Sequence, residues 1–213
     1  MRVDVFTLVP HAFAWLTEQR PIAGVLGGEL DLRLFSYRDS SPLKAGQVDD
    51  EPYGGGAGML LRVDVVAAAL DAVYGGPPGH RVIALTPQGR PLTQAVVEEL
   101  AGEGTLTLLS SRFEGFDERI VRHLSSDAIS IGPYVLSNGE LPAMVLLDAI
   151  ARRLPGALAE GSGELESFSP ELGGRLEYPH YTRPPEFRGW TVPDVLLSGD
   201  HARIDAWRRE HVR

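Results

Sequence analysis

Three segments rich in glycine and proline each come directly after an apolar run that predicts a buried strand. They read LTPQG at 85–89, SRFEGFDER at 111–119 and SIGPYVLSNGELPA at 130–143. In such loops, backbone N–H and C=O groups are open to bind an adenine edge or a small polar cofactor. Any one of them is more simply explained as a tight turn. Three at the same edge of a sheet favour a ligand-binding crevice.

A fourth glycine cluster, YGGGAG at 53–58, follows the acidic run VDDEP at 48–52. It lacks the Lys-Ser/Thr pair of a P-loop and does not match GxGxxG, so it indicates neither an NTPase nor a Rossmann-type dinucleotide site. Its glycines suit either a flexible lid or a close approach of two backbones. The carboxylates of Asp49 and Asp50 suit a base or a metal ligand, although solvated loop charges are the commoner explanation.

The chain has no cysteine, which excludes disulfides, a cysteine nucleophile, thiolate zinc sites and Cys-ligated iron–sulfur clusters. Its six histidines form no HExxH motif, so we predict no dedicated metal site. The first residues, MRVDVFTLVP, alternate like a strand and contain no signal-peptide core, and no apolar run is long enough to span a membrane. We therefore expect a soluble, cytoplasmic protein that makes no membrane contact.

Strand-like runs alternate with helical patterns along most of the chain. Asp64 is placed to cap a helix that carries Val66 and Leu70 on one face, and the apolar positions of 92–101 also follow a helical period. This alternation predicts an α/β fold with a mostly parallel sheet flanked by helices, in which ligands bind outside the carboxyl ends of the strands. The predicted strands cover 3–9, 30–37, 81–86, 105–110 and 128–131.

The segment 141–154, LPAMVLLDAIARRL, predicts a helix that is apolar nearly all round. Such a helix is either a central core helix or one buried in a dimer interface. The run 155–166 is rich in Gly, Ala and Glu and has no apolar period, which is typical of a mobile linker. A last helix is predicted after its cap Asp200, with Ile204 and Trp207 on one face.

Six motifs occur in order along nearly the whole chain: VDDEPYGGGAGM, LTPQG, RFEGFDER, SIGPYVLSNGELPAM, PHYTRP and VLLSGDH. Their order and spacing resemble the bacterial tRNA (guanine-N1)-methyltransferases of the TrmD type, in the SPOUT superfamily. The resemblance implies a homodimer that transfers a methyl group from S-adenosyl-L-methionine to N1 of the guanine 3′-adjacent to the anticodon in tRNA. It also implies a cofactor-binding α/β domain over 1–157 with a C-terminal trefoil knot, a flexible linker over 158–168, and a small, short helical tRNA-binding domain over 169–213.

The resemblance further implies roles for individual residues. Glu166 is the catalytic base and Arg152 is the cation near guanine O6, while Glu114 pairs with the amine of the cofactor. An assisting Mg²⁺ ion is left open. The substrate-binding residues are Asp50, Arg183, Arg203 and Arg208. The cofactor-binding residues are Leu85, Thr86, Pro87, Gln88, Gly89, Ser111, Arg112, Phe113, Glu114, Gly115, Ile131, Gly132, Pro133, Tyr134, Val135, Leu136, Ser137, Asn138, Gly139 and Pro142.

Some motif positions depart from the family pattern. Glu166 replaces an aspartate and adds one methylene, and Asn138 replaces a glycine, which is tolerable because Asn adopts a left-handed backbone more readily than most residues. Pro133 replaces an aspartate, Phe113 replaces a tyrosine, and Ser111 replaces a glycine. These changes keep two further interpretations open: a SPOUT relative that methylates another RNA or a small molecule, and a non-catalytic module that binds RNA or nucleotides.

The net charge of −9 argues against a broad basic surface, but the charge is unevenly distributed. Residues 1–179 carry −10, whereas residues 180–213 carry +1. We therefore expect tRNA contacts that are few, made by arginines, and concentrated in the C-terminal segment and the dimer cleft. The arginines concerned are Arg183, Arg188, Arg203, Arg208, Arg209 and Arg213, with Arg152 and Arg153 before the linker.

Overall fold

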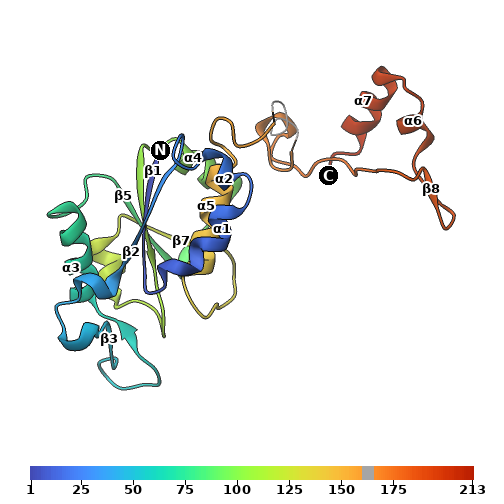
Figure 1. Cartoon of the computed structure of the whole chain (residues 1–213). Coiled ribbons are helices and arrows are strands. Elements are labelled where there is room, and N and C mark those ends of the chain that lie inside the picture. Colours follow the sequence, from blue (N-terminus) through green and yellow to red (C-terminus); the bar gives the residue numbers. More distant parts are fainter. Residues whose placement is uncertain (160–165) are drawn as a thin grey trace. The chain divides into compact units, whose positions relative to one another are not determined.

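The computed structural model describes residues 1–159 and 166–213. The chain divides into two compact units, Met1–Ala157 (unit 1) and Leu158–Arg213 (unit 2), and each is described by itself (Figure 1). Of the linker predicted over 158–168, residues 160–165 lie outside the described part. No helix in the described ranges is both long enough and apolar enough to cross a membrane.

Unit 1 is built on a five-stranded sheet in the order β2-β1-β6-β5-β7. Every neighbouring pair of its strands is parallel, which confirms the predicted α/β fold. All five predicted strands are present, and β5 is longer than predicted. The strands are β1 Arg2–Thr7, β2 Asp31–Ser36, β5 Arg81–Pro91, β6 Thr105–Ser110 and β7 Asp127–Ser130.

The alternation of side chains along the strands divides the core into two layers. Val3 and Val5 of β1 are buried in one layer and Phe6 in the other. Helices α1, α2, α4 and α5 cover the first layer, and α3 covers the second (Figure 1). Parallel sheets are normally covered in this way on both faces. The helices are α1 Ala14–Glu18, α2 Ile22–Val25, α3 Val63–Tyr74, α4 Gln94–Ala101 and α5 Glu140–Ala151.

Two helix starts differ from the prediction. Asp64 does not cap α3 but lies in its first turn, where an acidic side chain is favoured by the helix dipole and is held by the guanidinium of Arg62 at 2.8 Å. Helix α4 begins at Gln94, because the hydroxyl of Thr93 accepts a hydrogen bond from the N–H of Val96 at 3.4 Å.

Helix α5 is the apolar helix predicted over 141–154, and a single chain covers it only in part. Leu146 and Ile150 are buried in the first core layer. Leu141 and Val145, one helical turn apart, are 49% and 46% exposed. Helix α5 is therefore a core helix with one apolar strip that faces away from the core of its own chain.

Short elements fill the connections of unit 1. The antiparallel pair β3–β4 brackets the glycine cluster at 53–58. These elements are β3 Asp49–Asp50 and β4 Leu60–Leu61, with the single turns η1 Pro10–Phe13, η2 Tyr37–Ser40, η3 Lys44–Gly46 and η4 Ile120–Leu124, the last a π-type turn.

Unit 2 contains more than the small helical segment that the sequence predicts. Helix α7, His201–Glu210, begins after Asp200, whose carboxylate accepts a hydrogen bond from the N–H of Arg203 at 3.2 Å, so the predicted cap is confirmed. An antiparallel hairpin of β8, Glu186–Phe187, and β9, Trp190–Thr191, is also present. Its strands are too short to produce a recognisable alternation. The remaining elements are η5 Pro170–Leu172 and α6 Asp194–Leu197.

Candidate active site

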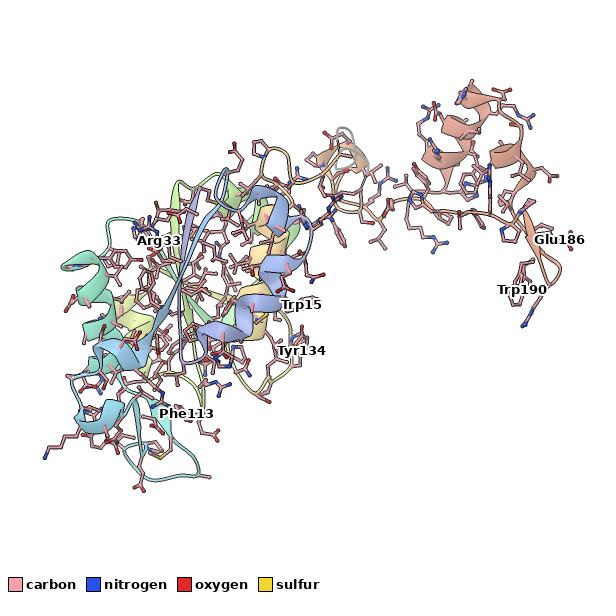
Figure 2. The ribbon with its side chains drawn as sticks, in the orientation of Figure 1. Trp15, Arg33, Phe113, Tyr134, Glu186 and Trp190 are labelled. Atoms are coloured by element: carbon pink, nitrogen blue, oxygen red, sulfur yellow. The ribbon has the colours of Figure 1, made fainter. Side chains whose placement is uncertain are left out.

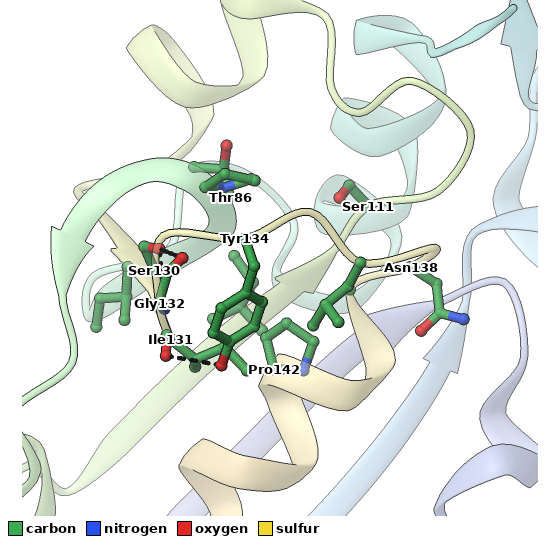
Figure 3. Close-up of a pocket in the computed structure, with 13 residues that line it drawn as sticks. Thr86, Ser111, Ser130, Ile131, Gly132, Tyr134, Asn138 and Pro142 are labelled. Atoms are coloured by element: carbon green, nitrogen blue, oxygen red, sulfur yellow. Dashed lines mark hydrogen bonds between the residues drawn. The ribbon is translucent and has the colours of Figure 1, made fainter.

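A pocket opens at the carboxyl ends of β6, β5 and β7, which are adjacent strands of the sheet. Its cavity volume is about 50 Å³, so the pocket is narrow. Its walls come from the three glycine- and proline-rich segments (Figure 3). The lining residues are Leu85, Thr86, Pro87, Ser111, Ile129, Ser130, Ile131, Gly132, Tyr134, Leu136, Asn138, Gly139 and Pro142.

The first segment is a bulge within β5. Leu85 and Arg90 both pair with Ile129 of β7, so residues 86–89 are excluded from the ladder. A Cβ at Gly89 would lie 2.5 Å from the carbonyl carbon of Ala128. Glycine is needed at this position because the two backbones approach so closely.

The third segment folds back onto the second. The N–H of Gly139 donates to the carbonyl of Ser111 at 2.7 Å, and a Cβ at Gly139 would lie 2.5 Å from the Ser111 nitrogen. The hydroxyl of Tyr134 donates to the carbonyl of Ile131 at 3.0 Å and holds the ring across the loop (Figure 3). These backbone contacts fix the shape of the pocket.

The pocket brings together eleven of the predicted cofactor residues. It also includes Ile129 and Ser130, which the prediction omits although they end the strand that leads into the third segment. The predicted cofactor residues that do not line it are Gln88, Gly89, Arg112, Phe113, Glu114, Gly115, Pro133, Val135 and Ser137.

Part of the second segment lies against the glycine cluster at 53–58. The N–H of Glu114 donates to the carbonyl of Met59 at 2.9 Å. A Cβ at Gly58 would lie 2.5 Å from Oε1 of Glu114, and the backbone of Gly58 is left-handed at φ +81°. Of the two roles predicted for the glycine cluster, Gly58 therefore serves the close approach: it makes room for the side chain of Glu114.

The loop backbones differ from one expectation. The backbone of Asn138 is not left-handed, so the turn does not depend on the tolerance of asparagine for that conformation. Phe113, instead, is left-handed at φ 61°, which is unfavourable for a bulky residue. The side-chain oxygen of Asn138 is buried at the pocket and has no hydrogen-bond partner within the described protein.

A buried carboxylate lies at the start of α5, next to Gly139. Glu140 is 2% exposed, its Oε1 accepts from the Thr7 hydroxyl at 2.5 Å, and its Oε2 lies 3.7 Å from Nε of Arg112. Burial, and then the charge of Glu140, raise the pKa of Tyr37 well above its ordinary value. A buried charge persists only where it is paired, so Glu140 connects Arg112 in the second segment to β1 and α5.

A second, acidic pocket of about 410 Å³ lies beside the β3–β4 pair and includes Asp50, Asp64 and Asp117. Arg62 bridges two of these carboxylates, at 2.6 Å from Asp50 and 2.8 Å from Asp64, and lowers the pKa of Asp64. Within the described ranges, no three His, Asp or Glu side chains come together as metal ligands. The carboxylate of Asp50 is therefore held in an ion pair with Arg62.

The two predicted catalytic residues belong to different units. Arg152 follows α5, and its N–H donates to the carbonyl of Asp148 at 3.1 Å. Glu166 precedes η5, and its carbonyl accepts from the N–H of Ser169 at 3.0 Å. Both residues are half-buried.

The predicted tRNA-binding arginines Arg183, Arg203 and Arg208 all lie in unit 2. Arg183 lines a hollow beside α6, and Arg203 is in the first turn of α7. The guanidinium of Arg208 lies over the ring of Tyr178, 5.1 Å from its centroid. Two of the three, Arg203 and Arg208, therefore lie on the same helix, α7.

Comparison with known proteins extends over the whole chain. Residues 1–213 match the family model described as tRNA (guanine-1)-methyltransferase TrmD. A tRNA (guanine-N(1)-)-methyltransferase of Brevibacillus brevis is 49% identical over 98% of this chain and 85% of its own length. Proteins of the same name from Dehalococcoides mccartyi and Geobacillus kaustophilus are 48% and 47% identical over 99% of this chain and 85% and 86% of their own lengths.

Proposed function

Because this chain belongs to the tRNA (guanine-1)-methyltransferase TrmD family and methylates N1 of guanine in tRNA, we propose that its target is the guanine 3′-adjacent to the anticodon. We further propose that the methyl donor, S-adenosyl-L-methionine, binds in the pocket at the ends of β6, β5 and β7. The observation that carries this assignment is the convergence of three backbone loops at adjacent strand ends, where α/β sheets bind ligands.

The chemistry of the pocket fits this cofactor. Apolar side chains, among them Leu85, Ile131 and Leu136, suit an adenine ring, and backbone groups of the loops suit its polar edge. The buried side-chain oxygen of Asn138 has no partner in the described protein and is available to accept a hydrogen bond from the ligand's adenosine or amino group. Bound S-adenosylmethionine supplies an electrophilic methyl group on a sulfonium.

The remaining chemistry falls to residues of this chain. Guanine N1 carries a proton at neutral pH, so a carboxylate must accept that proton, and Glu166 is the residue proposed for this role. Negative charge develops at O6 as the proton leaves, and the guanidinium of Arg152 stabilises that charge. Glu114 provides a carboxylate for the cofactor's amine, and Gly58 leaves space for its side chain.

A homodimer and a trefoil knot over the C-terminal part of unit 1 belong to the same proposal. The exposed strip of Leu141 and Val145 on α5 supports the dimer, because apolar side chains in one row favour burial against a second copy. The hydrogen bond from the N–H of Gly139 to the carbonyl of Ser111 brings the second and third segments together, as a knot formed by these segments requires.

We also propose that unit 2 binds the tRNA, with unit 1 as the cofactor domain and 158–168 as the linker. Arg183, Arg203 and Arg208 supply positive charge within residues 180–213, which carry a net charge of +1. Asp50 faces the substrate from the acidic pocket, where an assisting Mg²⁺ would need ligands from the tRNA as well. We also propose that the enzyme acts in the cytoplasm, where it meets its tRNA substrate.

The roles of Glu166 and Arg152 are tested by Glu166→Gln and Arg152→Lys. Glu166→Gln is expected to lower methyl transfer about 10²- to 10⁴-fold, the usual contribution of general acid–base catalysis. Arg152→Lys keeps the charge but loses the planar guanidinium, and is expected to lower methyl transfer by up to about 10²- to 10³-fold, the usual cost of losing one charge-stabilising donor. In both variants, calorimetric affinity for S-adenosylmethionine should stay unchanged. Glu171→Gln, an exposed carboxylate in η5, is the matched control. Wild-type turnover in Glu166→Gln would remove Glu166 from the mechanism.

A further inference from the structure

The β8–β9 hairpin of unit 2 presents two aromatic side chains to solvent. Phe187 and Trp190 are cross-strand partners, and they are 53% and 70% exposed. Figure 2 shows Trp190 on this hairpin. Their ring centroids are 5.9 Å apart with 56° between the ring planes, so the rings do not stack face to face. The broad indole face of Trp190 is therefore not covered by its neighbour.

The turn of this hairpin holds an arginine in a strained backbone. Arg188 and Gly189 have φ of 55° and 80°, the left-handed pair that a two-residue type I′ turn requires. Asn-Gly or Asp-Gly meets this requirement with less strain than a long side chain does. Because strained backbone conformations concentrate at functional sites, this arginine is a candidate functional residue.

The position of Arg188 is defined by the hairpin itself. Its guanidinium lies 5.1 Å from the centroid of the Phe187 ring, so Phe187 holds the cation at the tip of the hairpin that carries Trp190. Over residues 180–193, Glu186 is the only acidic residue, against Arg183 and Arg188. The tip thus combines a flat aromatic face with a held positive charge.

This combination matches the chemistry of an unpaired nucleotide, which offers a flat base and a negative phosphate. We infer that the β8–β9 hairpin is a base-stacking contact for the tRNA substrate, in which Trp190 stacks on an unpaired base and Arg188 binds an adjacent phosphate. The inference rests on the proposed role of unit 2 in tRNA binding.

The test measures the dissociation constant of the full chain for tRNA and separates stacking from apolar contact at one position. Trp190→Ala and Trp190→Leu are both expected to weaken tRNA binding roughly 5- to 140-fold, while Trp190→Phe restores most of the affinity. Leu176→Ala, which removes an exposed apolar side chain elsewhere in unit 2, is the control and is expected to bind normally. A Trp190→Leu variant that binds like the wild type would overturn the inference.

Arg188→Gly is expected to change stability and tRNA affinity in opposite directions, which a purely structural role of Arg188 would not produce. Glycine relieves the left-handed backbone, so thermal stability is expected to rise, while tRNA affinity falls and its salt dependence decreases by about one phosphate contact. If stability and tRNA affinity rise together, the proposed phosphate contact is wrong.

Three outcomes separate a failure of this inference from a failure of the proposals on which it rests. If wild-type protein binds and methylates tRNA and Trp190→Ala binds it equally well, the hairpin contact alone is refuted. If Trp190→Ala changes the sedimentation mass of the protein but not its tRNA affinity, the surface joins two copies of the chain, and the inference is again refuted. If the wild type does not bind tRNA, the failure lies with the proposed function.

Discussion

Gly139→Ala tests whether the close approach of the second and third segments shapes the cofactor pocket. The backbone of Gly139, with φ −85° and ψ −6°, is fully accessible to alanine, so the substitution introduces no strain of its own. The new Cβ would lie 2.5 Å from the Ser111 nitrogen, about 0.9 Å short of ordinary van der Waals contact. Because the obstacle is backbone, the two loops must move apart and lengthen the hydrogen bond between Gly139 and Ser111.

A displacement of this size has a predictable cost. Misplacement on the scale of 1 Å lowers enzyme rates about 10²-fold, so kcat/KM for S-adenosylmethionine is expected to fall by that factor. Overpacking costs about 1–3 kcal/mol, which corresponds to a fall in Tm of roughly 2–12 °C for a chain of this length.

The assay is labelled-methyl transfer at varied cofactor concentration, with calorimetry for cofactor affinity. Gly79→Ala is the matched control, because no atom lies within 4 Å of its Cβ position. It should remain within about 1 kcal/mol of the wild type in stability and keep full activity. A Gly139→Ala variant with wild-type kcat/KM and Tm would refute the reasoning.

The remaining predictions concern Gly58 and His80. Gly58→Ala should displace Glu114 and raise the KM for S-adenosylmethionine about 10- to 140-fold. Gly54 is also left-handed but has open space around it, so Gly54→Ala should leave this KM unchanged. Equal effects of the two substitutions would mean that backbone strain, and not the displacement of Glu114, raises the KM. Burial lowers the pKa of His80 from 6.5, so the unfolded chain takes up the proton first and stability falls as pH drops below 6.5. Urea unfolding of His80→Gln should then show a smaller loss over that range, and an unchanged pH profile would exclude His80 as the cause.

Most of the sheet follows from the sequence because buried parallel strands are short, continuous apolar runs. Residues 105–110 predict β6 with its observed bounds. The end of β5 is not predictable in this way, because it depends on a bulge against β7 that only the pairing of Leu85 and Arg90 with Ile129 defines. Asp64 is misjudged as a cap because Asp is common both at the cap and in the first turn, and here Arg62 holds it in the turn.

The candidate site is predictable to a similar degree. Glycine- and proline-rich segments after strands indicate the pocket, because parallel strands place their carboxyl ends at one edge. Ile129 and Ser130 are missed because they belong to β7, whose last side chains turn into the pocket. The contact of Gly58 with Glu114 joins segments distant in sequence, and a single sequence contains no signal for it. The β8–β9 hairpin escapes prediction because Arg-Gly is an unusual type I′ turn.

The central claim is that this enzyme methylates N1 of the guanine beside the anticodon. The most direct measurement is labelled-methyl incorporation from S-adenosylmethionine into a tRNA with that guanine and into the same tRNA with adenine in its place, followed by mass spectrometry of the nucleosides. We predict 1-methylguanosine in the first tRNA and no incorporation above background in the second. Equal incorporation into both tRNAs would contradict the account.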